Sequence, residues 1–85
     1  MPYQIKYLKE SVEQLAKIPR NIRNSILDAI DERLTKYPEM FKPLRGDLIG
    51  YYRLRVGKYR VIYKIEKEIV TVFIIRVNVR SAVYK

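Results

Sequence analysis

The sequence predicts a single α+β domain over residues 1–85, with the element order β-α-α-β-β-β and an antiparallel sheet whose two helices pack on one face. Three observations lead to this fold. Apolar residues follow a helical period in the first half of the chain. Runs rich in Tyr, Val and Ile alternate with polar residues in the second half. Residues 38–50, with two prolines and two glycines, separate the halves as a loop would.

The first half predicts a short strand followed by two helices. Residues 3–8 alternate apolar and polar side chains, as a strand with one buried face does. Residues 12–18 have apolar side chains at helical spacing, and Ser11 is a candidate start for this helix. Pro19 suits the first turn of a second helix, which Pro38 ends. We expect one face of the second helix to pack in the core rather than bind a partner, since the sheet would otherwise be uncovered: Ile22, Ile26, Ala29, Ile30, Leu34 and Tyr37.

The second half predicts three strands, at residues 51–56, 59–65 and 69–79. Gly57 and Lys58 separate the first two, and a two-residue loop that begins with glycine is typical of a type II′ hairpin. This turn fixes the register, so that Arg55 lies opposite Arg60. Residues 66–68 predict a three-residue loop between the last two strands, which would pair Ile65 with Ile69 and Arg60 with Ile74.

Side chains alternate between the two faces of a strand, so these registers sort the sheet into an apolar face and a basic face. The helices must cover the apolar face, and we expect the basic face to form an open platform. From the last strand, we expect Thr71, Phe73, Ile75 and Val77 on the apolar face and Arg76, Asn78 and Arg80 on the basic face. The basic face also receives Arg53, Arg55, Arg60 and Lys64 from the first hairpin.

The formal net charge is +9, and it is unevenly distributed along the chain. Residues 1–44 have eight basic and six acidic side chains, whereas residues 45–85 have ten basic and three acidic ones. This concentration of positive charge in the second half favours a polyanionic partner, namely RNA, DNA or an acidic protein. The alternative is a basic surface that serves only solubility.

The composition excludes several classes of site. The chain has no cysteine and no histidine, which rules out a disulfide scaffold, a thiolate zinc site, a Ser-His-Asp triad and histidine acid–base chemistry. We therefore expect no metal and no cofactor. No apolar run approaches the ~20 residues of a membrane span, and the N-terminus lacks a signal-peptide pattern. These features predict a cytoplasmic protein that does not bind membranes.

The expected pairing of Arg55 with Arg60 points to an anion-binding site. Like charges opposed across two strands destabilise a sheet unless an anion lies between them. Arginine is well suited to phosphate because its guanidinium group is planar, bidentate and always charged. The alternative is that the long side chains splay and remain hydrated. Tyr84, close to the C-terminus, either packs on the sheet or offers its ring to a nucleobase.

Residues 44–46, 50–63 and 72–84 resemble the RelE/ParE superfamily of toxins from toxin–antitoxin systems, most specifically in the segment YRLRVGKYRVIY at residues 52–63. The likeness covers essentially the whole chain. It implies one of two activities: RelE-like toxins cleave messenger RNA in the ribosomal A site and arrest translation, whereas ParE-like toxins poison DNA gyrase. It also implies neutralisation by a cognate antitoxin, which we expect to be acidic. The late Arg80 and the terminal Tyr84 favour the RelE branch.

The resemblance also implies roles for individual residues. The RNA's own 2′-hydroxyl would attack the phosphorus without a metal, while Arg55 and Arg60 hold the phosphate and Arg53 positions the strand. Arg80 would stabilise or protonate the leaving oxygen, and Tyr84 would stack on a base or orient the 2′-hydroxyl. We expect four further residues to bind the substrate: Arg76, Lys58, Lys64 and Arg45.

The sequence does not identify the general base of this reaction. RelE-like toxins often have lysine at one or both of the second-strand positions that are arginine here, and arginine, with a pKa above ~12, is a poor base. The candidates are Tyr84 as tyrosinate, Lys58 and a group of the ribosomal RNA. The alternatives to an endoribonuclease are a ParE-like gyrase inhibitor and a nucleic-acid-binding module without catalytic activity.

Overall fold

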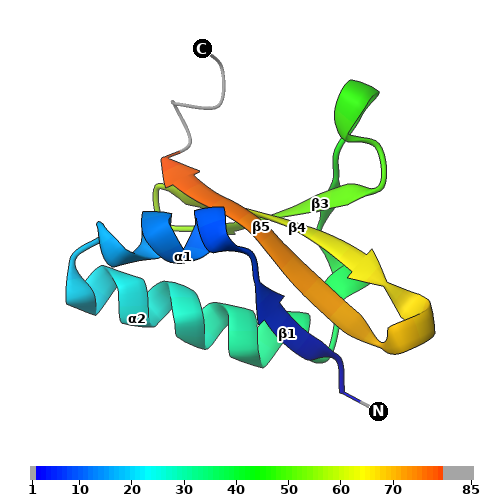
Figure 1. Ribbon diagram of the computed structural model, residues 1–85, viewed down its shortest axis with the longest axis horizontal. Coiled ribbons are helices and arrows are strands. Elements are labelled where there is room, and N and C mark those ends of the chain that lie inside the picture. Colours follow the sequence, from blue (N-terminus) through cyan, green and yellow to red (C-terminus); the bar gives the residue numbers. More distant parts are fainter. Residues whose placement is uncertain (1, 80–85) are drawn as a thin grey trace.

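The computed structural model describes residues 2–79, which form two helices packed on one face of a five-stranded sheet (Figure 1). None of the helices in this part of the chain is long and apolar enough to cross a membrane. In chain order, the elements are β1 (Gln4–Tyr7), α1 (Lys9–Ala16), α2 (Arg20–Ala29), which continues as a π-helical turn (Ile30–Leu34), β2 (Lys42–Pro43), β3 (Tyr51–Val56), β4 (Tyr59–Glu66) and β5 (Thr71–Val79). Short 3₁₀ turns lie at Pro38–Met40, Gly46–Leu48 and Lys67–Ile69.

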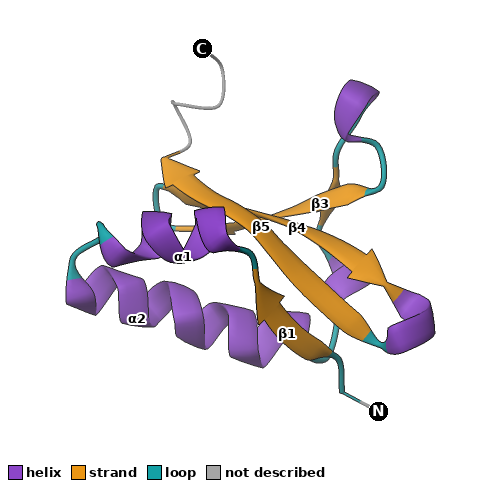
Figure 2. Ribbon diagram, viewed as in Figure 1, coloured by secondary structure: helices purple, strands orange, loops and turns teal. Residues whose placement is uncertain are grey.

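The sheet has the strand order β1-β5-β4-β3-β2. Figure 2 distinguishes the strands (orange) from the helices (purple). The predicted α+β class with both helices on one face is confirmed. The sheet is mixed, however, and not antiparallel throughout, because β1 runs parallel to β5, with Gln4 opposite Thr71 and Tyr7 opposite Ile74. Almost the whole chain separates these two strands. The turn signals that fix neighbouring strands therefore give no information about their relative direction.

Strand β2 is a two-residue edge strand within the segment that the sequence assigned to a loop. Lys42 lies opposite Arg53 and Pro43 lies opposite Tyr52. Proline lacks an N–H donor and is tolerated in a sheet only at such an edge. Two residues are too few to show an alternating pattern, so the sequence does not predict this strand.

Helix α1 begins two residues before the predicted start at Ser11. The Ser11 hydroxyl donates a hydrogen bond to the Leu8 carbonyl oxygen at 2.7 Å, and the side chain is buried. Ser11 thus bonds back to the preceding turn instead of capping the helix, a known alternative for serine in a first turn. Leu8 occupies the N-cap position without a side-chain cap.

The core lies between the helices and the sheet. Ile26, Ile30 and Leu34 of the predicted helix face are fully buried, and Ile22 and Ala29 pack against them. Tyr37 is 59% exposed, contrary to prediction. The wider π-helical turn that ends at Leu34 breaks the 3.6-residue spacing on which that prediction rested. The core also includes Leu15, Ile18, Leu54, Val61, Tyr63, Val72, Ile74 and Val77.

Tyr63 links β4 to the 3₁₀ turn at Pro38–Met40, which follows the helices. Its ring stacks on Tyr52 with centroids 5.6 Å apart, and its hydroxyl donates a hydrogen bond to the Pro38 carbonyl oxygen at 2.6 Å. Burial, and to a lesser extent Tyr52, raises the pKa of Tyr63 well above its ordinary value. The hydroxyl therefore stays protonated as a donor.

We expect Tyr63→Phe to lower the free energy of unfolding by about 1–3 kcal/mol, because it leaves the buried Pro38 carbonyl without this donor. Urea denaturation of the two proteins measures the difference. Tyr37→Phe removes an exposed hydroxyl and serves as the control. Equal stability of Tyr63→Phe and the wild-type protein would contradict this role.

Candidate functional site

The hairpin between β3 and β4 brings two arginines directly opposite each other. Val56 pairs with Tyr59 and Arg55 pairs with Arg60, which confirms the predicted register. Gly57 has a φ of +59°, whereas Lys58 has a negative φ, the combination that a type II′ turn requires. The glycine at the turn thus fixes the arrangement of the arginines.

The predicted register between β4 and β5 is wrong. Ile65 pairs with Val72 instead of Ile69, and Arg60 pairs with Asn78 instead of Ile74. The connection spans residues 67–70 and ends at Val70, which has a left-handed conformation with a φ of +50°. The loop signal in the sequence ended at residue 68. The structure adds two apolar residues to the turn, one of which, Ile69, is 60% exposed.

This shift by three residues exchanges the faces of the first half of β5. Val72 and Ile74 lie in the core, whereas Phe73 lies opposite Lys64 on the helix-free face. The predicted placement of Thr71, Phe73 and Ile75 on the core-facing side is therefore wrong. The core-facing placement of Val77 is confirmed.

A β-bulge restores the predicted faces in the second half of β5. Tyr63 pairs with Ile74, whereas the preceding Ile62 pairs with Arg76, so Ile75 is an extra residue on β5. The extra residue reverses the alternation, which returns Arg76 and Asn78 to the helix-free face. If Ile75 instead paired with Ile62 in a regular ladder, Arg76 would pair with Val61 and point into the core. Bulges occur often beside active sites, where they redirect a side chain.

Five side chains of β3, β4 and β5 therefore share the helix-free face and are called the arginine cluster here: Arg53, Arg55, Arg60, Arg76 and Asn78. Arg55 is exposed and Arg53 is half-buried, but Arg60 is only 3% exposed. The expectation of a fully open platform is therefore wrong at Arg60. Arg53 and Arg60 both interact with other groups of the protein. Arg55 is the member of the opposed pair that reaches solvent.

Asn78 adds an acceptor to this set of donors. Its Oδ1 is buried and accepts no hydrogen bond within residues 2–79. A buried polar atom without a partner is costly, and in native proteins such atoms often lie at functional positions. The predicted face of Asn78 is confirmed, but its sequence context indicates no role for it. Its only sequence signal is an amide side chain between two valines, directly after Arg76 and Val77.

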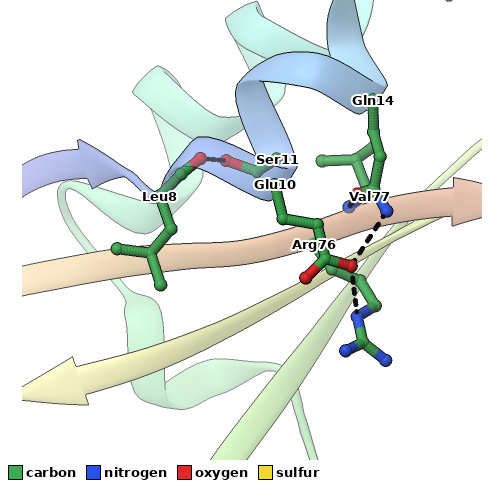
Figure 3. A network of polar contacts seen from close by, with 6 residues as sticks. All are labelled: Leu8, Glu10, Ser11, Gln14, Arg76 and Val77. Atoms are coloured by element: carbon green, nitrogen blue, oxygen red, sulfur yellow. Dashed lines mark hydrogen bonds and ion pairs between the residues drawn. The ribbon is translucent and has the colours of Figure 1, made fainter.

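Helix α1 covers the edge of β5 beyond the end of β1 (Figure 3). The Val77 N–H donates a hydrogen bond to Gln14 Oε1 at 2.5 Å, and Gln14 Nε2 donates one to Glu10 Oε2 at 3.1 Å. The same Glu10 oxygen lies 3.3 Å from Arg76 Nε. Both charged side chains are about half exposed, and exposed ion pairs are weak. A phosphate group can therefore compete for Arg76.

The remaining predicted substrate-binding residues lie around the cluster. Lys58 is in the hairpin turn, with its Nζ 5.9 Å from the ring centroid of Tyr59. Lys64 shares the helix-free face and forms an ion pair with Glu66 at 3.2 Å. Arg45 lies at the opposite end of β3 from Arg55. It follows Leu44, whose N–H donates a hydrogen bond to the carbonyl oxygen of Tyr51, the first residue of β3.

Two predicted catalytic residues, Arg80 and Tyr84, lie outside the described residues, and their roles remain predictions. Two tyrosines within the described part have a raised pKa. Burial, followed by the charge of Asp31, raises the pKa of Tyr7 to about 12, and Tyr63 is raised in the same direction. Both side chains face the helices, away from the arginine cluster. Neither is placed to act as a base there.

Comparison with known proteins decides the family. The model of the ParE toxin of type II toxin–antitoxin systems matches residues 5–84. The chain belongs to this toxin family. The chain is also 34% identical to toxin RelG of Mycobacterium tuberculosis, over 100% of this chain and 99% of RelG. It is 33% identical to toxin RelE of the same organism, over 99% of this chain and 88% of that toxin.

A solved structure agrees with this assignment. The toxin–antitoxin complex RelBE2 from Mycobacterium tuberculosis contains a chain with a TM-score of 0.88 and 33% sequence identity, covering 95% of this chain and 94% of that one. The chain is thus a RelE-like toxin of a type II toxin–antitoxin system, as the sequence resemblance predicted.

Proposed function

We propose that this RelE-like toxin is an endoribonuclease that cleaves messenger RNA and thereby stops translation. The observation that supports the proposal best is the direct opposition of Arg55 and Arg60 on the sheet face that the helices leave uncovered. A fold gains no stability from opposed arginines unless an anion lies between them. The similarity to toxins RelG and RelE makes an RNA phosphate the fitting anion.

In this proposal, the RNA supplies its own nucleophile. The 2′-hydroxyl attacks the adjacent phosphorus, the bond to the 5′-oxygen breaks, and a cyclic phosphate forms on the upstream fragment. Arg55 holds the phosphate from the solvent side, and the buried Arg60 stabilises the charge that develops on its oxygens. Guanidinium groups stay protonated in proteins, and a charge acts more strongly where water is excluded.

The protons of this reaction need separate groups. Asn78 Oδ1 lies beside Arg60 in the sheet and is buried in the free protein. Once bound RNA displaces the side chains over it, this oxygen would accept a hydrogen bond from the 2′-hydroxyl and orient the attack without removing the proton. The base is Tyr84, Lys58 or a group of the ribosomal RNA, and Arg80 protonates or stabilises the leaving oxygen. Arg53 and Arg76 position the strand on either side of Ile62, their common neighbour in the sheet.

We further propose that the toxin acts in the ribosomal A site in the cytoplasm, without a metal or cofactor, and that a cognate acidic antitoxin neutralises it. The related RelBE2 structure is a toxin–antitoxin complex. A formal charge of +9 suits an acidic partner as well as RNA.

Expression from a tightly controlled promoter, followed by mapping of RNA 5′ ends in the arrested cells, tests this proposal. We expect a rapid stop in amino-acid incorporation and new 5′ ends inside coding sequences. Intact messages together with DNA damage would indicate a gyrase inhibitor instead. Intact messages bound to the protein, with a steep dependence of binding on salt, would indicate a non-catalytic RNA-binding module.

A further inference from the structure

A second set of side chains occupies the helix-free face, at the end of the sheet away from the arginine pair. Lys64 of β4 lies opposite Tyr51 of β3 on one side and opposite Phe73 of β5 on the other. Phe73 in turn lies beside Lys6 of β1. These four residues form one row across four strands, in which aromatic rings alternate with lysines. We call them the aromatic row.

Neither aromatic ring of this row belongs to the core. Tyr51 and Phe73 are half-buried, and both are absent from the hydrophobic cluster and from the residues that pack against it. Their neighbours Tyr52 and Ile74 point to the opposite face and supply the core contacts there. The stability of the fold therefore does not account for two aromatic residues on this face.

The lysine between the rings is held loosely. Lys64 Nζ lies 6.0 Å from the ring centroid of Tyr51 and 3.2 Å from a Glu66 carboxylate oxygen. The side chains of Lys64 and Glu66 are each 44% exposed. Such a surface ion pair is weak, so a phosphate can displace Glu66 from Lys64. Partly exposed rings interleaved with cations are typical of surfaces that bind single-stranded nucleic acids, since bases stack on the rings and phosphates contact the cations.

We propose that the aromatic row binds the nucleotides that flank the cleaved phosphate, with Tyr51 and Phe73 stacking on bases and Lys64 contacting the backbone. This inference rests on the proposed function. Arg60 and Lys64 lie four residues apart on β4, which corresponds to about 13 Å along the strand. The row is therefore a subsite separate from the arginine cluster and continuous with it. Stacking tolerates any base, so the row provides affinity without sequence preference.

The test compares Tyr51→Leu and Phe73→Leu with the wild-type protein. Leucine keeps an apolar side chain on the strand but removes the aromatic face, and Tyr51→Phe keeps that face. Tyr37→Leu is the matched control, because Tyr37 is an exposed tyrosine outside the sheet. We would measure the affinity for a short single-stranded 2′-O-methyl RNA, the kcat/KM for message cleavage on programmed ribosomes, and the melting temperature of each protein.

We expect each leucine variant to bind the RNA about tenfold more weakly at an unchanged salt dependence, and Tyr51→Phe to bind like the wild-type protein. Lys64→Gln should instead reduce the slope of log affinity against log salt by about 0.7, whereas Lys67→Gln, outside the row, should not. Glu66→Gln should tighten binding, because it releases Lys64.

Failure of this inference and failure of the proposed function give different results. If the leucine variants bind and cleave RNA like the wild-type protein, the aromatic row is not a subsite, although the toxin remains a ribonuclease. If the wild-type protein leaves messages intact but the leucine variants lose RNA affinity, the row is supported and the catalytic proposal fails. An equal loss of affinity for poly-L-glutamate would overturn the inference in favour of a surface for acidic proteins.

Discussion

Arg60→Met and Arg55→Ala are each expected to lower kcat/KM for message cleavage by at least about 100-fold, the usual loss when one preorganised donor to a transition state is removed. Arg55 and Arg60 lie directly opposite each other, so either change leaves one guanidinium group to stabilise the charge on the phosphate. Arg60 is buried, and methionine fills most of its volume. Single-turnover cleavage on programmed ribosomes measures the effect.

Two controls separate catalysis from folding. Arg33→Ala removes an exposed arginine from the π-helical turn, far from the sheet face, and should cleave like the wild-type protein. The melting temperature of Arg60→Met shows whether the buried position tolerates the change. A folded Arg60→Met variant with full activity would overturn the assignment of this pair to the phosphate.

Deletion of Val77 is expected to destabilise the protein by more than about 3 kcal/mol. Asn78 would then take the core position of Val77, or, if the bulge at Ile75 closed, Arg76 would take it. The core would lose an apolar side chain, worth about 1.5–3 kcal/mol, and gain either a polar group without a partner or an unpaired charge, which costs about 3–5 kcal/mol. Urea denaturation measures the loss. Deletion of Ile75 serves as the control, because it joins the Tyr63–Ile74 pair to the Ile62–Arg76 pair and leaves every other residue of β5 on its face. A Val77 deletion as stable as the Ile75 deletion would show that the alternation along β5 does not determine which side chains are buried.

The sequence was sufficient where a local turn determined the geometry. Gly57 and Lys58 admit one hairpin type, and from it the opposition of Arg55 and Arg60 followed correctly. The stripe of Ile26, Ile30 and Leu34 likewise predicted the buried helix face. In each case the signal lies within a few residues and has one dominant physical interpretation.

The sequence was insufficient where tertiary packing chose among local alternatives. The run from Ile69 to Val79 is apolar or β-branched at most positions, so either alternation fits, and neither the longer turn nor the bulge at Ile75 has a distinctive signature. The parallel pairing of β1 with β5 depends on contacts between opposite ends of the chain. The burial of Arg60 depends on which residues surround it in the folded protein. Composition and charge do not predict those neighbours.

The central claim is that an RNA phosphate binds between Arg55 and Arg60 on the helix-free face. The side-chain Nε–H signals of the arginines in an NMR titration with a short 2′-O-methyl RNA, which cannot be cleaved, test it most directly. We expect the signals of Arg55 and Arg60 to shift on binding, while those of Arg20 and Arg33 on the helical side do not. Shifts confined to Arg20 and Arg33, with Arg55 and Arg60 unchanged, would contradict the claim.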